Sequence, residues 1–173
     1  MSALRAVEPG NPSIRTASGG RFTFLTPRKC DVNIHDIAAS LSRICRYTGQ
    51  LPNPDIHYSV AQHSVLVSRL CPPALAVWGL MHDSAEAYIG DVSSPLKSLL
   101  QDYRLIEHKV EQCVWSVFGL KGPLPPAVKV ADNKAYEMEA RQFYEGIHSG
   151  IVPVWHGAAR RLFLERAEEL GII

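Results

Sequence analysis

The stretch that decides the fold is Pro73–Asp91, with the sequence PALAVWGLMHDSAEAYIGD. Apolar residues occupy almost every side of a helical wheel drawn for it, which is typical of a helix covered by protein on all sides. Gly90 follows the last apolar residue, and glycine commonly ends helices. We therefore predict a helix from about residue 73 to residue 89, and we expect it to be central and buried.

Three polar side chains interrupt this apolar segment. His82 and Asp83 are adjacent and Glu86 follows a turn later, so a continuous helix would hold all three within about 100° of arc. Burial of a carboxylate is costly unless a cation or strong donors compensate it, and here two carboxylates lie together. A bound cation is the best explanation. The alternative is that this sector faces water, but the flanking apolar residues argue against it, including Trp78, which we assign to the core.

The rest of the chain favours an all-α domain around this helix. Helical spacing of apolar residues, interrupted by Gly and Pro, predicts further helical segments at about 35–47, 59–70, 95–118, 126–146 and 156–170. Ahead of them, Ser18-Gly19-Gly20 separates two short segments, which indicates a short hairpin or extended arm. We expect one domain of about six helices over residues 1–173, with an arm at 1–33, a helical core at 35–146 and a C-terminal helix at 156–170.

Composition and charge exclude several classes of protein. The 173 residues include 18 Lys and Arg and 17 Asp and Glu, for a net charge of +1, whereas binding to nucleic-acid polymers needs clustered positive charge. The four cysteines form no C-x-x-C pair, so neither a zinc finger nor a dense disulfide framework is expected. The sequence starts without the pattern of a signal peptide and contains no run of about 18 apolar residues. We expect a soluble, cytoplasmic protein that binds neither nucleic-acid polymers nor membranes.

Two other predicted helices carry polar residues on faces that should point inward. His63 lies on the apolar face of the segment at 59–70, and a lone inward histidine is more often a hydrogen-bonded core residue than a ligand. Asp132 lies on the apolar face of the segment at 126–146. Two imidazoles and two carboxylates together would suit a six-coordinate divalent ion and leave about two positions for water and a substrate oxygen. This candidate metal set consists of His63, His82, Asp83 and Asp132.

The spacing of these residues resembles the H…HD…D signature of the HD superfamily of metal-dependent phosphohydrolases. The block His82–Lys97, HDSAEAYIGDVSSPLK, is similar to the H-D-x-x-E-x-x-x-G-D-x-x-x-P-x-K run of the bacterial 5′-deoxynucleotidases. Leu41-Ser42-Arg43 and Gln62-His63-Ser64 resemble the L-S-R and E-H-S pieces of that group. The resemblance covers about residues 35–140 and is closer still to compact phage and prophage phosphohydrolases, some of which are dATP triphosphohydrolases.

Two departures from the family pattern leave the substrate open. Where relatives carry a histidine ahead of L-S-R, this chain has Ala39-Ser40, and the loop at 50–57 is longer than is usual. Both lie near the place where the family holds the sugar or base.

The resemblance implies an HD-domain helical bundle that holds one divalent metal ion per chain. Co, Mn, Ni, Fe and Mg all accept such ligands, and Co or Mn is favoured in vitro. His108 is expected to face solvent, and His35, His148 and His156 have no evident partner. A two-metal HD enzyme is therefore disfavoured.

The resemblance also implies roles for the residues around the ion, each with a plain core or surface role as its alternative. Glu86 would act as the base toward a water molecule, and Asp91 would hold the leaving oxygen or a sugar hydroxyl. Arg43 and Lys97 would neutralise phosphate charge. The candidates for nucleoside binding are Arg46, Tyr47 and Tyr58, and His57 is expected near the mouth of the pocket.

Two classes of function remain. The first is an enzyme that cleaves the 5′ phosphoester of a deoxynucleotide, either as a dNTP triphosphohydrolase, which the compact relatives favour, or as a 5′-deoxynucleotidase on dNMPs. A triphosphate substrate needs extra cations, and the suppliers considered are Arg15, Arg21, Lys97 and Lys134. The second is a non-catalytic HD-like module that binds a nucleotide or a partner protein. A homo-oligomer through an apolar helix face is compatible with both, and a phage-encoded protein would work in the host cytoplasm.

Overall fold

A computed structural model describes residues 11–173, which are mostly helical with one small β-hairpin. The all-α class is therefore confirmed. The helices, with two four-residue segments among them, are α1 Ile34–Leu41, α2 Val60–Leu70, α3 Ala76–Met81, α4 Glu86–Ile89, α5 Ser94–Lys97, α6 Gln101–Val117, α7 Pro126–Phe143 and α8 His156–Glu169. Short 3₁₀ turns lie at η1 Lys29–Asp31, η2 Arg46–Gly49 and η3 Pro73–Leu75.

The expected hairpin is present and closes one side of the helical core. Strands β1 Ser13–Arg15 and β2 Arg21–Thr23 pair antiparallel, with Ile14 opposite Phe22. Phe22 is fully buried and stacks on Tyr88 of α4, with ring centroids 4.0 Å apart. At the hairpin turn, the Ser18 backbone N–H donates to the Asp36 carboxylate over 2.6 Å. The hairpin is thus fixed to α1 and α4. The predicted arm starts at residue 1, and its first ten residues lie outside the described part of the chain.

The central stretch is buried, as expected, but it is not one helix, so the prediction of a continuous helix at 73–89 was wrong. It divides into η3, α3, a turn over residues 82–85 and α4. The Met81 carbonyl explains the break, because it accepts hydrogen bonds from the backbone N–H and the hydroxyl of Ser84 and from the indole of Trp115. These hydrogen bonds take the place of the helical one that the backbone N–H of Ala85 would have donated to the Met81 carbonyl.

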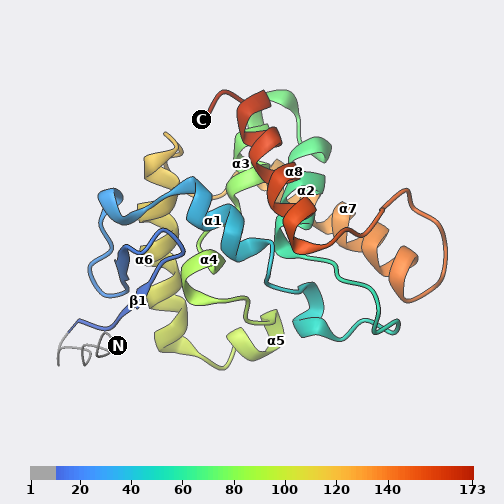
Figure 1. Cartoon of the computed structure of the whole chain (residues 1–173), viewed down its shortest axis with the longest axis horizontal. Helices are drawn as coiled ribbons and strands as arrows, with labels where there is room; N and C mark the ends of the chain where they lie inside the picture. The colour runs from blue at the N-terminus through green and yellow to red at the C-terminus, as the bar shows by residue number, and fades with distance from the viewer. Residues whose placement is uncertain (1–10) are drawn as a thin grey trace.

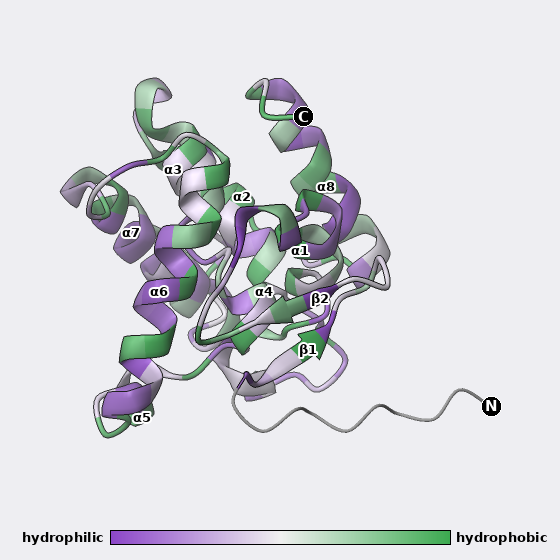
Figure 2. Cartoon of the chain, turned by 90° about the vertical axis from the view of Figure 1, so that its left-hand side faces the viewer, coloured by the Kyte–Doolittle hydropathy of each residue, from purple (hydrophilic) through white to green (hydrophobic). Residues whose placement is uncertain are grey.

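Helix α3 lies in the middle of the molecule, between α6 and α7 in Figure 1. It packs against α2, α7 and α8, and Trp78 meets Trp115 of α6 edge to face at 5.2 Å. The contact with α2 is close at Gly79, where a Cβ atom would lie 2.8 Å from the Cα of Ser68. Figure 2 shows α6 on the side of the molecule that faces the viewer, with hydrophilic and hydrophobic turns alternating along it.

Helix α1 ends at Leu41, six residues earlier than the spacing predicted, because the chain then pairs with a segment far along the sequence. Cys45 and Ser59 form an antiparallel bridge. The Arg46 N–H donates to the Tyr58 carbonyl, and the Val60 N–H donates to the Ile44 carbonyl. Helices α2, α7 and α8 follow the expected segments within a few residues. Among residues 11–173, no helix is long and apolar enough to cross a membrane.

Candidate metal centre

Three elements bring His63, His82 and Asp132 together. His63 lies on α2, His82 follows the end of α3, and Asp132 lies on α7. One ligand atom from each of the three side chains lies within 4.8 Å of the other two. The His63 Nε2 atom is 3.1 Å from Asp132 Oδ1, and His82 Nε2 is 3.9 Å from the same oxygen. These three side chains could hold a metal ion, which confirms the coarser part of the cofactor prediction.

Asp83, the fourth predicted ligand, lies beside these three. Its Oδ2 atom is 3.2 Å from His82 Nε2 and 3.7 Å from His63 Nε2. Burial by itself raises the pKa of Asp83, but the neighbouring imidazoles, His82 foremost, outweigh it and hold that pKa below its usual range. Burial also raises the pKa of Asp132, but His63 and His82 outweigh this effect and the pKa is lowered. Both carboxylates are therefore negative where a cation would lie.

The second ring nitrogen of each histidine is already engaged, which leaves Nε2 as the free atom. The Nδ1 atom of His63 is 2.6 Å from a Glu139 oxygen, and Nδ1 of His82 is 2.8 Å from the Gly79 carbonyl. Since both partners are acceptors, we assign the ring proton to Nδ1 in each case. Both Nε2 atoms are buried and lack a hydrogen-bond partner within the described part of the chain. A divalent cation that displaces any proton from these Nε2 atoms would meet two nitrogen lone pairs and two carboxylates, and it fits this donor set.

Glu86 and Asp91 lie next to this cluster, where the sequence placed them. Glu86 is the first residue of α4 and is buried, and its Oε2 atom has no hydrogen-bond partner among residues 11–173. Burial raises the pKa of Glu86 well above its ordinary value, and the charges of Asp83 and Asp91 add to this. Burial also raises the pKa of Asp91, against the opposing charge of Arg46. Both carboxyl groups are thus better proton acceptors than exposed ones.

Asp132 lines two pockets, and through them the cluster can be reached. One has a volume of about 290 Å³ and the other about 410 Å³, and Lys129 lines both. The smaller pocket contains His82 and Asp83, together with Glu111 and Trp115 of α6. The larger pocket is lined by Arg46, Tyr47, Thr48, Asp91, Ser93, Ser94, Pro95, Lys129, Asp132, Asn133 and Tyr136. A substrate with two chemically different ends could therefore occupy both pockets, which share Asp132 and Lys129.

The cations at these pockets differ from those the sequence indicated. Arg43 is exposed, donates to the Ala39 carbonyl over 2.6 Å and lines a separate pocket of about 280 Å³ with hairpin residues. Arg43 lines neither pocket beside Asp132, so phosphate binding by Arg43 at the metal cluster stays a prediction that this placement does not favour. Lys97 lies 2.5 Å from Glu107 of α6, so its charge is paired. Lys129, which donates to Asp132 over 2.6 Å, was missed.

The further cations considered for a triphosphate lie elsewhere. Arg15 lines the same separate pocket as Arg43. Arg21 donates to the Ser13 hydroxyl over 2.6 Å within the hairpin. Lys134 is exposed on α7. None of the three lines either pocket beside Asp132.

The three nucleoside candidates share one partner, Glu139 of α7. Tyr47 and Tyr58 donate their hydroxyls to its carboxylate over 2.8 and 3.0 Å, and Arg46 lies 3.3 Å from it. Arg46 and Tyr47 also line the larger pocket, so nucleoside contact by them stays a prediction. Tyr58 is only 1% exposed, and its burial removes it from the candidates for contact with a base at the cluster.

Glu139 is the main residue that the sequence reasoning missed. It is fully buried, and although burial raises its pKa, the charges and hydrogen bonds of His63, Arg46 and Tyr47 outweigh this and lower the pKa to about 2. The signal in the sequence is its position seven residues after Asp132, on the same inward face of α7. A polar residue at that spacing points toward the site and can form a hydrogen bond with one of its ligands, as Glu139 does with His63.

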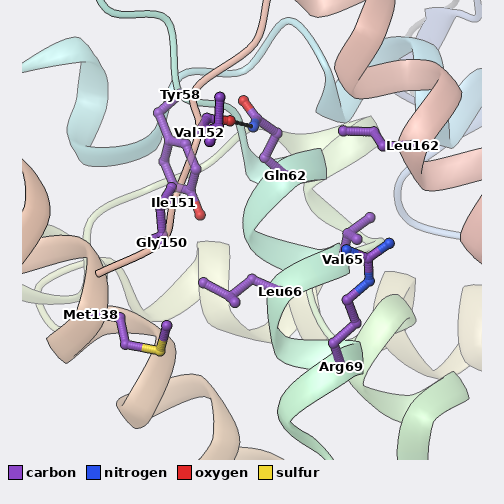
Figure 3. A pocket seen from close by; sticks show the side chains of 10 residues that line it. All are labelled: Tyr58, Gln62, Val65, Leu66, Arg69, Met138, Gly150, Ile151, Val152 and Leu162. Atoms are coloured by element: carbon purple, nitrogen blue, oxygen red, sulfur yellow. Dashed lines mark hydrogen bonds between the residues drawn. The ribbon is translucent and has the colours of Figure 1, made fainter. Parts of the chain in front are cut away.

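Tyr58 lines another pocket, which contains none of the metal-cluster residues (Figure 3). Its volume is about 240 Å³. There the Gln62 side chain donates to the Val152 carbonyl and accepts from the Val154 N–H, each over 3.1 Å. This amide fixes the segment after α7 against α2. His57 stacks on Trp155 at 5.9 Å and lies outside the pockets at Asp132. His108 is exposed as expected, yet it lines the smaller of those pockets.

Comparison with known proteins gives two relatives of similar length and no matching family model. The uncharacterized protein RCAP_rcc00048 of Rhodobacter capsulatus is 35% identical over 140 residues, covering 74% of this chain and 71% of the relative. The uncharacterized protein YfdR of Escherichia coli (strain K12) is 39% identical over 172 residues, covering 91% of this chain and 95% of the relative. The chain belongs to the family of these two proteins.

Proposed function

We propose that this protein is a metal-dependent phosphohydrolase of the HD type that cleaves the 5′ phosphoester of deoxynucleotides. One observation carries the proposal: two buried imidazole nitrogens without hydrogen-bond partners among the described residues converge on the Asp132 carboxylate, beside a buried Glu86. The resemblance of His82–Lys97 to the deoxynucleotidase run supports it from the sequence.

The residues present fit a single divalent ion. His63, His82 and Asp132 would hold it, with Asp83 as the fourth ligand, and Co or Mn suits this mixture of imidazole and carboxylate. When bound, the ion supplies Lewis acidity toward a phosphate oxygen. The other contributions come from the side chains around it.

Glu86 is the proposed base. Its unpartnered Oε2 atom is free to accept a proton from water, and its raised pKa makes it a stronger base than an exposed glutamate. The water oxygen forms a bond to the innermost phosphorus, and the bond from phosphorus to the 5′ oxygen breaks. The leaving oxygen takes a proton, for which Asp91, with its raised pKa, is the proposed donor. Nucleoside is released together with phosphate or triphosphate.

The two pockets at Asp132 favour a nucleoside triphosphate. A phosphate chain would extend along Lys129, which lines both pockets, while the nucleoside would take the larger pocket beside Tyr47 and Tyr136. Arg46 replaces Arg43 as the proposed arginine for phosphate, because it faces the larger pocket. A dNMP would leave one of the two pockets unused, so the 5′-deoxynucleotidase activity is the second choice.

The test is a chromatographic screen of the four dNTPs and four dNMPs with Mn²⁺, Co²⁺ or Mg²⁺. We expect hydrolysis of at least one dNTP with release of triphosphate. Glu86→Ala should retain the metal and lose about 10²–10⁴-fold in kcat, the usual contribution of a general base, while Glu137→Ala, an exposed glutamate on α7, should match the wild type. If every nucleotide survives with all three metals, the chain is a binding module and the proposal fails.

A further inference from the structure

Glu139 joins the metal cluster to the larger pocket through a set of hydrogen bonds that no catalytic role yet explains. One carboxylate oxygen, Oε1, lies 2.6 Å from His63 Nδ1 and 3.0 Å from the Tyr58 hydroxyl. The other, Oε2, lies 2.8 Å from the Tyr47 hydroxyl and 3.3 Å from an Arg46 nitrogen. Each oxygen therefore has two donors, one pair directed toward the cluster and α2 and the other toward the pocket.

The site is built to keep this carboxylate in one place. Glu139 is fully buried, His63 is fully buried, and Tyr58 is 1% exposed. A buried carboxylate with four donors has little freedom to rotate, because any other rotamer would leave several buried polar groups unpaired. Its position therefore determines the orientation of the His63 ring and keeps the ring proton on Nδ1, which directs the Nε2 lone pair toward Asp132.

The same carboxylate supports a loop with an unusual backbone. Tyr47 and Thr48 adopt left-handed conformations, with φ of 57° and 52°, which residues other than glycine seldom adopt. Such conformations persist when surrounding contacts impose them, and they cluster at functional sites. The hydrogen bond from Tyr47 to Glu139 is one such contact. Arg46 and Tyr47 are thereby held at the wall of the larger pocket.

We propose that Glu139 is a positioning residue that sets the geometry of the metal ligand His63 and of the nucleotide-facing residues Arg46 and Tyr47 at the same time. The part of the inference that concerns Arg46 and Tyr47 rests on the proposed function. The part that concerns His63 rests only on the metal cluster. Loss of Glu139 should therefore weaken metal binding and nucleotide binding together. Loss of one pocket-side hydrogen bond should affect the nucleotide far more than the metal.

The experiment compares Glu139→Gln with Glu137→Gln, an exposed glutamate on the same helix. The affinity for Mn²⁺ alone is measured by electron paramagnetic resonance on protein without nucleotide. We expect Glu139→Gln to bind Mn²⁺ about 10- to 100-fold more weakly, as is usual when the outer partner of a ligand histidine is changed. Glu137→Gln should bind it as the wild type does. Equal Mn²⁺ affinity of the two variants overturns the inference.

The pocket side is tested with Tyr47→Phe, which removes a single hydroxyl. We expect a KM for the nucleotide raised about 2- to 10-fold, the worth of one hydrogen bond, with kcat changed less and Mn²⁺ affinity unchanged. An unchanged KM overturns the pocket half of the inference. If Glu139→Gln fails to fold, as circular dichroism would reveal, the double variant Tyr47→Phe/Tyr58→Phe takes its place. It should lower Mn²⁺ affinity by about 2- to 10-fold, and no change counts against the inference.

The two proposals fail in different ways. A wild type that hydrolyses no nucleotide, with Mn²⁺ affinity still lower in Glu139→Gln than in Glu137→Gln, refutes the proposed function and retains the inference on His63. A wild type that hydrolyses dNTPs, with both variants equal in Mn²⁺ affinity, retains the function and refutes the inference.

Discussion

The substitution Gly79→Ala tests whether the close approach of α2 and α3 sets the distance between the two histidines. A Cβ atom at residue 79 would lie 2.8 Å from the Ser68 Cα and 2.8 Å from the Cys71 sulfur, whereas ordinary contacts begin near 3.4 Å. The Ser68 contact is with backbone, so rotation of a side chain does not relieve it. The helices must separate by about 0.6 Å at this point.

The expected cost follows from that overlap. Overpacking in a core typically costs about 1–3 kcal/mol, and the better helix propensity of Ala returns about 0.5–1 kcal/mol. The net loss in the free energy of unfolding is therefore about 1 kcal/mol at the middle of these ranges and about 2.5 kcal/mol at most. For a chain of this size, a loss of about 1 kcal/mol should lower Tm by about 2–4 °C. Since His63 lies on α2 and His82 follows α3, Mn²⁺ affinity should fall as well.

The assay is thermal unfolding by circular dichroism, with Mn²⁺ binding measured on the same samples. The matched control is Gly157→Ala in α8, where an added Cβ meets nothing within 4 Å. That variant should be as stable as the wild type or slightly more stable. A Gly79→Ala protein that melts at the wild-type temperature and binds Mn²⁺ equally well would refute the argument that this contact sets the spacing of the site.

Three further predictions concern the site. Lys129→Met should raise KM for a dNTP about tenfold with little change in Tm, because Lys129 is 63% exposed and lines both pockets; steady-state kinetics would contradict this if KM stayed the same. Saturating Mn²⁺ at about 100 times its Kd should stabilise the protein by about 2.7 kcal/mol, a gain that EDTA or His82→Ala abolishes in a melting experiment. Burial, reinforced by Glu107, raises the pKa of Glu111 to about 7, so the folded state binds the proton more tightly and stability falls as pH rises from about 4.5 to 7. In EDTA, Glu111→Gln should flatten this slope, and an equal slope in both proteins would exclude Glu111 as its origin.

Local periodicity was sufficient for much of the fold. The expected segments for α2, α7 and α8 match the structure within a few residues, because an inward apolar stripe on one helix depends only on the residues of that helix. The same periodicity put His63 and Asp132 on inward faces. In a small domain, inward polar side chains on separate helices share one interior and tend to meet there. The His63 Nε2 and Asp132 Oδ1 atoms lie 3.1 Å apart.

Periodicity failed where residues distant in sequence compete for the backbone. The break after Met81 depends on Trp115, which lies 34 residues later, and the early end of α1 depends on pairing of Cys45 with Ser59. The resemblance, and not periodicity, favoured Arg43 as the arginine for phosphate. The observed chain path after α1 places Arg46 at the larger pocket and Arg43 at a separate one.

The helical class, the hairpin and the inward direction of His63 and Asp132 could be predicted from the residues alone, since they follow from the chemistry of neighbouring residues along one helix or turn. That Glu139 holds His63 and that Lys129 lies at both pockets became evident from the folded chain. The physical reason is that a hydrogen bond or an ion pair needs an atom of a second segment at a definite distance and angle. Spacing along one helix predicts the direction of a side chain, but the packing of other helices around it determines which atoms it meets.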